Sequence, residues 1–177
     1  NSLGYVLIQA SRFEEASQVL LDAQRKAQEA GALNTLFSIL RNRITALSKE
    51  SRYAESLEAL QSLALLEERL GSPRDLAYNL LRQGSTYLIL GMGEAARTCL
   101  EKGLALALEI GDERLGGWLL LTKAYVEREG GDSERSRNLL KQVVDAAKSL
   151  SDQDLLAWSR YALADLAFLR AVLGGSM

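Results

Sequence analysis

Residues 71–110 read GSPRDLAYNLLRQGSTYLILGMGEAARTCLEKGLALALEI, and this pattern of residue types returns every 40 residues along the chain. Residues that stand 40 positions apart form columns in which size and polarity are kept. Three such columns hold Leu20, Leu60, Leu100 and Leu140; Ala16, Ser56, Ala96 and Ser136; and Gly31, Gly71, Gly111 and Ser151. Matches in this many columns, without slippage, indicate a repeat protein.

Each 40-residue unit is predicted to hold two helices. Leucines recur at helical spacing between residues 57 and 70, and the glycine column follows each second helix, where a left-handed residue is favoured. Ser72 and Pro73 suit the cap and the first position of the next helix. Asp112 and Asp152 are expected to cap the corresponding later helices.

The pattern therefore predicts an all-α solenoid of antiparallel helix pairs. Its nine helices are expected at about residues 1–10, 13–30, 33–49, 53–70, 73–90, 93–110, 113–129, 133–149 and 152–172. The small residues of the Ala16 column let the helices of a pair approach closely. Because no single pair buries its apolar face alone, neighbouring pairs must stack.

Composition excludes several classes of function. The chain of 177 residues is 47% hydrophobic and 25% charged, close to the average of globular proteins, and no apolar run reaches the roughly 20 residues of a membrane span. The net charge of −2 argues against nucleic acid as a partner. The absence of histidine and of a phosphate-binding loop argues against an enzyme, a metal site and a cofactor. The single cysteine, Cys99, allows no internal disulfide and suits a reducing, cytoplasmic compartment.

The columns resemble the tetratricopeptide repeat. The residues that match are Leu3-Gly4, Leu7, Phe13, Ala16, Leu20 and Ala23, and then Gly84, Tyr87, Gly91, Ala96, Leu100 and Gly103. The standard unit has about 34 residues, so these units are about one helical turn longer. Long units of this type resemble those of bacterial transcription activators of the maltose-regulator type, of bacterial signalling kinases and cyclases, and of Pins-type scaffolds. The resemblance implies a right-handed superhelix that serves protein–protein interaction.

The whole chain, residues 1–177, is expected to form one array. It would comprise a partial unit at 1–30, complete units at 31–70, 71–110 and 111–150, and a partial unit at 151–177. The last helix is apolar on more than one face, which is unusual for a capping helix and leads us to expect a fragment of a longer protein. The alternative is that this helix caps the array and docks in a homodimer.

The fourth unit departs from the repeat. Glu127 stands in the column of Leu7 and Leu47, and a local shift of two residues would instead place Trp118 and Tyr125 in core columns. We keep the unshifted register, because the small and leucine columns stay in phase on the far side of the loop. In this register Glu127 is expected to be a surface charge.

The resemblance also implies which residues bind a partner, because the first helix of each pair lines the concave face. In its polar N-terminal half this face would present Arg41, Asn42, Tyr78 and Arg82, and in its aromatic C-terminal half Trp118, Tyr125, Trp158, Tyr161 and Phe168. Aromatic and arginine side chains are the types that anchor partners, so a peptide with acidic and apolar groups would fit this groove. The alternative is that the aromatic residues only pack between successive helices.

Three functions stay open. The first is a non-catalytic scaffold within a larger signalling or transcription regulator, the second an effector-sensing domain with a pocket around Trp118 and Trp158, and the third a self-associating spacer. A chaperone-type carboxylate clamp is not expected, because only Asn42 and Arg82 match its columns. Cys99 is expected to be a buried small hydrophobe. The acidic pairs Glu14-Glu15 and Glu67-Glu68 are interpreted as solvated helix faces.

Overall fold

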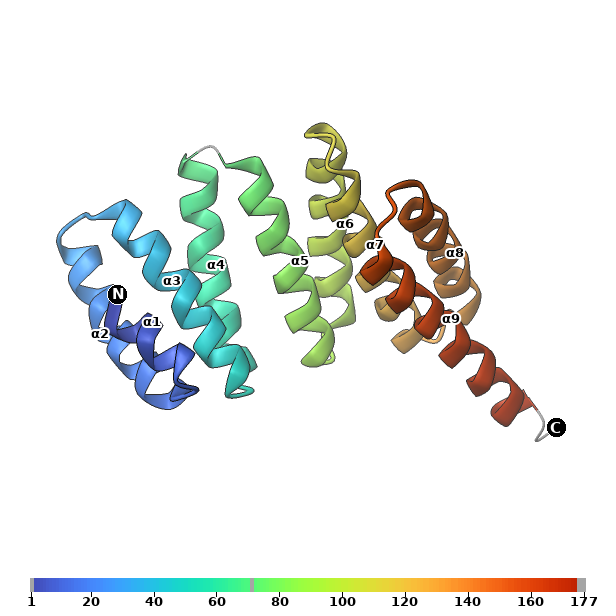
Figure 1. Cartoon of the computed structure of the whole chain (residues 1–177), viewed down its shortest axis with the longest axis horizontal. Helices are drawn as coiled ribbons and strands as arrows, with labels where there is room; N and C mark the ends of the chain where they lie inside the picture. Colours follow the sequence, from blue (N-terminus) through green and yellow to red (C-terminus); the bar gives the residue numbers. More distant parts are fainter. Residues whose placement is uncertain (1, 71, 175–177) are drawn as a thin grey trace.

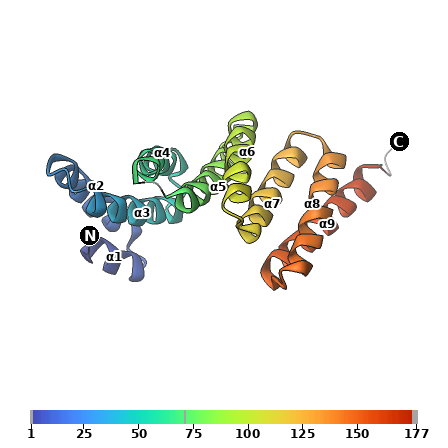
Figure 2. The same ribbon diagram turned by 90° about the horizontal axis from the view of Figure 1, so that it is seen from above.

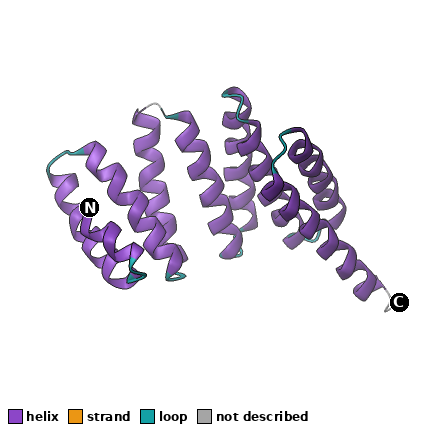
Figure 3. Ribbon diagram, in the orientation of Figure 1, coloured by secondary structure: helices purple, strands orange, loops and turns teal. Residues whose placement is uncertain are grey.

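Nine helices and no strand lie in the residues that this computed structural model describes, 2–70 and 72–174 (Figures 1 and 3). They are α1 (Ser2–Gln9), α2 (Phe13–Glu29), α3 (Leu33–Lys49), α4 (Tyr53–Leu70), α5 (Pro73–Ile89), α6 (Gly93–Glu109), α7 (Glu113–Glu129), α8 (Ser133–Ser149) and α9 (Gln153–Gly174). The predicted all-α solenoid is confirmed, with helix ends within two residues of those expected. None of these helices is long and apolar enough to cross a membrane.

The 40-residue period is visible in where the helices begin. The even-numbered helices α2, α4, α6 and α8 start at Phe13, Tyr53, Gly93 and Ser133, and the odd-numbered helices from α3 onward start at Leu33, Pro73, Glu113 and Gln153. Helix α7 thus keeps the unshifted register, and Trp118 and Tyr125 remain only half-buried.

The turns between helices use left-handed backbone at a fixed phase. Gly31 and Gly111 adopt φ of 62° and 68° as expected, whereas Gly71 lies outside the described residues. Three serines in equivalent turns also have positive φ. Asp112 and Asp152 accept backbone N–H groups from the first turn of α7 and α9, which confirms both caps. The prediction that the side chain of Ser72 caps α5 is wrong, because its hydroxyl accepts no hydrogen bond from the first turn of this helix.

The small and leucine columns form the packed interior of each pair. Every member of the Ala16 column and of the Leu20 column is buried. The approach is close at Gly84, where an added Cβ would lie 2.7 Å from Cγ of Leu100, and closer still at Gly4, where it would lie 2.5 Å from Cγ of Leu20. The repeat therefore fixes the spacing between the helices of a pair through a few small residues.

The prediction that Glu127 is a surface charge is wrong, because the residue is buried, with only 2% of its surface exposed. The guanidinium of Arg97 in α6 donates two hydrogen bonds to its carboxylate, of 3.1 Å from Nε and 3.2 Å from Nη2. The equivalent positions one unit earlier hold Leu57 and Tyr87. The carboxylate of Glu127 therefore occupies a column that holds Leu7, Leu47 and Tyr87 in earlier units.

The odd-numbered helices lie on the inside of the curved row. Helix α1 contacts α3, α5 contacts α7 and α7 contacts α9, whereas no two even-numbered helices touch within the described residues. Figure 2 shows α1 and α3 on the same side of α2 and α4. Helices inside a curve approach each other more closely than those outside it, so the first helix of each pair faces the concave side. One odd-numbered pair breaks the series, since the backbones of α3 and α5 do not come close in the part of the chain that is described, although the side chains of Arg41 and Asp75 reach across.

Two alanine substitutions should test the packing rule in opposite directions. Gly84→Ala should lower the free energy of unfolding by about 1–3 kcal/mol, because its Cβ collides with Leu100. Gly116→Ala in α7 should raise it by about 0.5–1 kcal/mol, because its Cβ meets nothing within 4 Å and alanine favours the helix. Urea unfolding followed by circular dichroism measures both, and equal effects of the two variants would contradict the packing rule.

The Arg97–Glu127 pair should behave as a replaceable ion pair. Arg97→Leu alone should cost about 3 kcal/mol, because it leaves a buried carboxylate without its main partner. Adding Glu127→Leu should recover most of that loss, since the double variant restores apolar residues to both columns. The double-mutant cycle is measured by urea unfolding, and additive losses would show that the pair has no such coupling.

Candidate functional site

The aromatic residues expected on the concave face fall into two groups. Trp118 and Tyr125 of α7 are half-buried and pack against the apolar cluster that joins α7, α8 and α9. The guanidinium of Arg128 covers the Tyr125 ring at 5.1 Å from its centroid and is held by Asp165 at 2.6 Å. In α7, therefore, these rings stabilise the contact between successive odd-numbered helices.

The aromatic side chains of α9 are mostly open to solvent. Trp158, Tyr161 and Phe168 are 54%, 64% and 66% exposed. The Trp158 and Tyr161 rings meet edge to face, with centroids 6.3 Å apart. The opposite face of the helix, which includes Leu155 and Ala162, is buried against the preceding pair. We call Trp158, Tyr161 and Phe168 the α9 aromatic surface.

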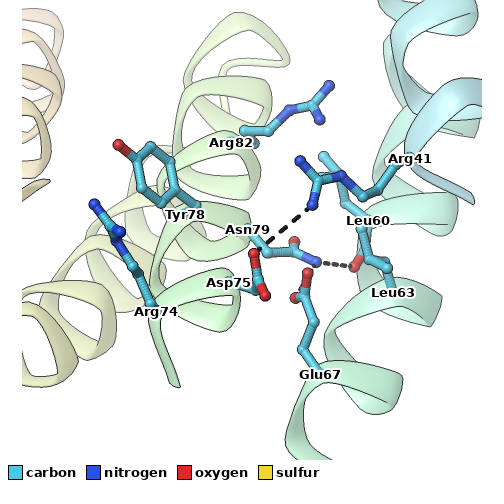
Figure 4. A pocket seen from close by; sticks show the side chains of 9 residues that line it. All are labelled: Arg41, Leu60, Leu63, Glu67, Arg74, Asp75, Tyr78, Asn79 and Arg82. Atoms are coloured by element: carbon cyan, nitrogen blue, oxygen red, sulfur yellow. Dashed lines mark hydrogen bonds and ion pairs between the residues drawn. The ribbon is translucent and has the colours of Figure 1, made fainter. Parts of the chain in front are cut away.

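The structure brings three residues of the predicted polar half together at a pocket between α3, α4 and α5. This junction pocket has a volume of about 300 Å³ and includes Arg41, Tyr78 and Arg82 in its wall (Figure 4). Asn42 stands beside Arg41 in α3 and is half-buried. Within the described residues, the pocket therefore lies where the backbones of two consecutive odd-numbered helices do not come close and only side chains span the gap.

Positive charge in the junction pocket is only partly neutralised. Arg41 faces Asp75 at 3.7 Å, whereas Arg74 donates to Asp112 at 2.9 Å, at the mouth of the pocket. The guanidinium of Arg82 has no ion pair or hydrogen bond with any described residue. Burial, and then the nearby charge of Arg41, lower the pKa of Arg82, as expected for a cation that has lost water without gaining an anion.

The floor of the pocket holds a buried acid that the sequence analysis placed wrongly. Glu67 is 3% exposed instead of solvated, and Asn79 Nδ2 donates to its Oε2 at 2.8 Å. The same Nδ2 donates to the backbone oxygen of Leu60 at 3.0 Å, and Asn79 Oδ1 accepts from Gln83. Burial raises the pKa of Glu67 to about 7, although the Asn79 hydrogen bond opposes this shift.

The repeat contained a signal for this buried cluster. Glu67 belongs to the column of Ala27, Ala107 and Ala147, and Asn79 to the column of Ile39, Leu119 and Ser159. All of these residues are buried. Polar residues in two otherwise buried columns therefore mark the junction between α4 and α5.

Cys99 is also less buried than expected. It is half-buried in α6, its Sγ lies 3.8 Å from Oε1 of Gln83, and burial raises the pKa of its thiol. A raised pKa disfavours the nucleophilic thiolate. In the described residues no group of three or more acidic, histidine or cysteine side chains is placed to hold a metal ion.

Comparison with known proteins identifies the fold and no more. No protein-family model matches the chain, and no curated protein matches it. A signal-transduction ATPase with numerous domains (STAND) from Pyrococcus horikoshii, with a tetratricopeptide repeat sensor, aligns with 99% of this chain at 14% identity and a TM-score of 0.79. The match spans only 29% of that protein.

Tetratricopeptide-like repeats of a putative kinesin light chain from Podosopora anserina match in a similar way. They align with 99% of this chain and 85% of theirs at 15% identity, with TM-scores of 0.77 for a variant and 0.74 for a second structure. The chain thus has a tetratricopeptide-like fold, whereas identities this low carry no information on function.

The buried carboxyl of Glu67 should make stability depend on pH. Its folded pKa of about 7 lies above the ordinary 4.5, so its stabilising contribution is complete below about pH 4.5 and is lost as pH rises through 7. Glu67→Gln should therefore raise the free energy of unfolding at pH 8 by on the order of 2 kcal/mol and leave it nearly unchanged at pH 4.5. Glu68→Gln, at the exposed neighbouring position, is the matched control. A wild-type-like pH profile in Glu67→Gln would contradict the assignment.

Proposed function

We propose that the chain is a non-catalytic protein-interaction module of a larger signalling or transcription regulator, and that it acts in the cytoplasm. Its partner is a peptide or a domain that binds along the concave face. The α9 aromatic surface is the observation that carries this proposal, because three large rings are exposed on a helix whose opposite face is packed. Exposed apolar surface of this kind marks interaction sites.

The two ends of the face suit different parts of a partner. Apolar or aromatic side chains would bind at Trp158, Tyr161 and Phe168, and acidic groups would bind near Arg41 and Arg82. Trp118 and Tyr125 support the aromatic end from α7 by packing, and Asn42 and Tyr78 border the polar end. This arrangement needs neither a cofactor nor a metal. An extended peptide would lie with its acidic part at the polar end and its apolar part at the aromatic end.

Two alternatives keep a specific observation in their favour. The junction pocket favours an effector-sensing domain, although it lies at Arg41 and Arg82 and not at the expected Trp118 and Trp158. The exposed apolar residues of α9 favour self-association through that helix. Both alternatives share the fold, so binding experiments must separate them.

Selection of peptides from a random display library tests the proposal. Selected peptides should bind the wild type at least ten-fold more tightly than the variant Trp158→Ala/Tyr161→Ala, because truncation removes both exposed rings. Leu108→Ala is the matched control, since Leu108 is an exposed apolar residue on α6, away from the concave face. Circular dichroism checks that helix content is kept in all variants.

The result separates the three functions. Equal binding to the wild type and the double variant would overturn the role of the α9 aromatic surface. A wild type that selects no peptide but sediments as a dimer, with the double variant monomeric, would favour the self-associating spacer instead.

A further inference from the structure

The junction between α4 and α5 divides the solenoid into two blocks. One apolar cluster includes residues from α1 to α4, whereas the C-terminal block holds a cluster that begins at Ala77 in α5 and extends into α7 and another that joins α7, α8 and α9. Between them the buried columns hold Glu67 and Asn79 where other units hold mainly alanine and aliphatic residues. On the concave side the backbones of α3 and α5 do not come close in the described residues, and the junction pocket and the loose Arg41–Asp75 ion pair lie between them.

The charges of the pocket leave one cation uncompensated. Arg41 on α3 has Asp75 as its partner at a loose 3.7 Å, and Arg82 on α5 has none among the described residues. Glu67 is hydrogen-bonded to Asn79 at the floor, and Arg74 is engaged by Asp112. Figure 4 shows the side chains of Arg41, which is joined to Asp75 by a dashed line, and of Arg82, which has no such line, both at the wall of the pocket. A single negative charge at this place would neutralise the excess.

The geometry selects the type of anion. A carboxylate is planar, carries one charge and accepts paired hydrogen bonds from guanidinium groups. A phosphate dianion brings both of its charges beside the carboxylate of Asp75, which would repel it, whereas a dicarboxylic acid needs to place only one of its two carboxylates in the pocket. The volume of about 300 Å³ admits a carboxylate with a short aliphatic chain, for which Leu60 and Leu63 provide apolar surface.

We propose that the junction pocket binds a carboxylate that bridges Arg41 of α3 and Arg82 of α5, and so draws the two blocks of the solenoid together. The ligand is the side chain of an acidic residue in a partner peptide or a small free dicarboxylic acid. The inference rests on the proposed function, because it assigns the acidic part of the partner to one pocket. Binding of the carboxylate also changes the curvature of the array.

Titration with glutarate tests the site. Glutarate should bind the wild type at least ten-fold more tightly than it binds Arg82→Gln or Arg41→Gln, as measured by NMR shifts of arginine Nε–H groups. Arg41 is exposed, so its variant should fold even if Arg82→Gln does not. The matched control is Arg25→Gln, which removes the same charge from an exposed position on α2 and should bind as the wild type does. Glutarate binding that is unchanged in Arg41→Gln, or weaker than inorganic phosphate binding, would overturn the proposal.

Two blocked peptides identify the source of the carboxylate. One has a single central glutamate between alanines, and the other has glutamine in its place. Binding of the glutamate peptide at least as tight as that of glutarate, with none for the glutamine peptide, indicates a peptide partner. Binding of glutarate alone indicates a small effector and supports the same chemistry.

A distance measurement tests the movement. Spin labels at Gln28→Cys in α2 and Lys141→Cys in α8, in a Cys99→Ser background, report the separation of the two blocks. Saturating glutarate should shift this distance, whereas a pair at Gln28→Cys and Glu58→Cys, within one block, should stay unchanged. No shift across the junction at saturation would overturn the coupling.

The failure of this inference is distinguishable from that of the proposed function. Trp158→Ala/Tyr161→Ala should abolish binding of display-selected peptides and leave glutarate binding intact. A protein that binds selected peptides but not glutarate keeps the proposed function and loses the junction site.

Discussion

Every helix pair of this solenoid depends on its neighbour to cover its apolar face, so each junction between pairs must be built from complementary residues. At three junctions the corresponding positions hold Ala27 with Ile39, Ala107 with Leu119, and Ala147 with Ser159. At the junction of α4 and α5 the hydrogen bond from Asn79 to Glu67 stands in their place. A hydrogen bond between buried side chains contributes less than apolar burial and depends on its geometry. In the described part of the chain, this junction is therefore the one, among these four, that depends on a hydrogen bond between buried side chains of successive pairs.

The sequence predicted the architecture closely because the same pattern of residue types occurs in each unit of the repeat. Four copies of the small and leucine columns fix where each helix starts, and the computed ends differ from the expected ones by no more than two residues. The same method predicted that Arg41, Tyr78 and Arg82 share a face of the array. It could not predict that they meet at a pocket, because periodicity places residues on a helix but does not give the distance between α3 and α5.

Glu67 and Glu127 were placed wrongly for a common reason. Both were judged by residue type, as charges that belong in water, although the column of Glu67 is buried in the other units and the column of Glu127 is buried at Leu7 and Leu47. Position in the repeat outweighs polarity here, because Asn79 and Arg97 supply these carboxyl groups with hydrogen bonds inside the array. The α9 aromatic surface shows the reverse case, since Trp158 and Phe168 are exposed where no further helix packs in the described residues.

The two buried acids also show why a polar residue in a core column can mean two things. Glu127 has Arg97 as a bidentate partner within the chain, so its charge is satisfied and its role is complete in packing. Around Glu67 the charges are not balanced. Asn79 donates one hydrogen bond to Glu67, while the neighbouring Arg82 is partly removed from water and has no anion bound to it among the described residues. A partly buried cation without a counterion makes the fold less stable than a neutralised one would. Such departures from local rules are expected at functional sites. The two acids therefore differ in one respect. The cation that pairs with Glu127 lies within the chain, whereas the anion that would neutralise Arg82 in the junction pocket has to come from a ligand.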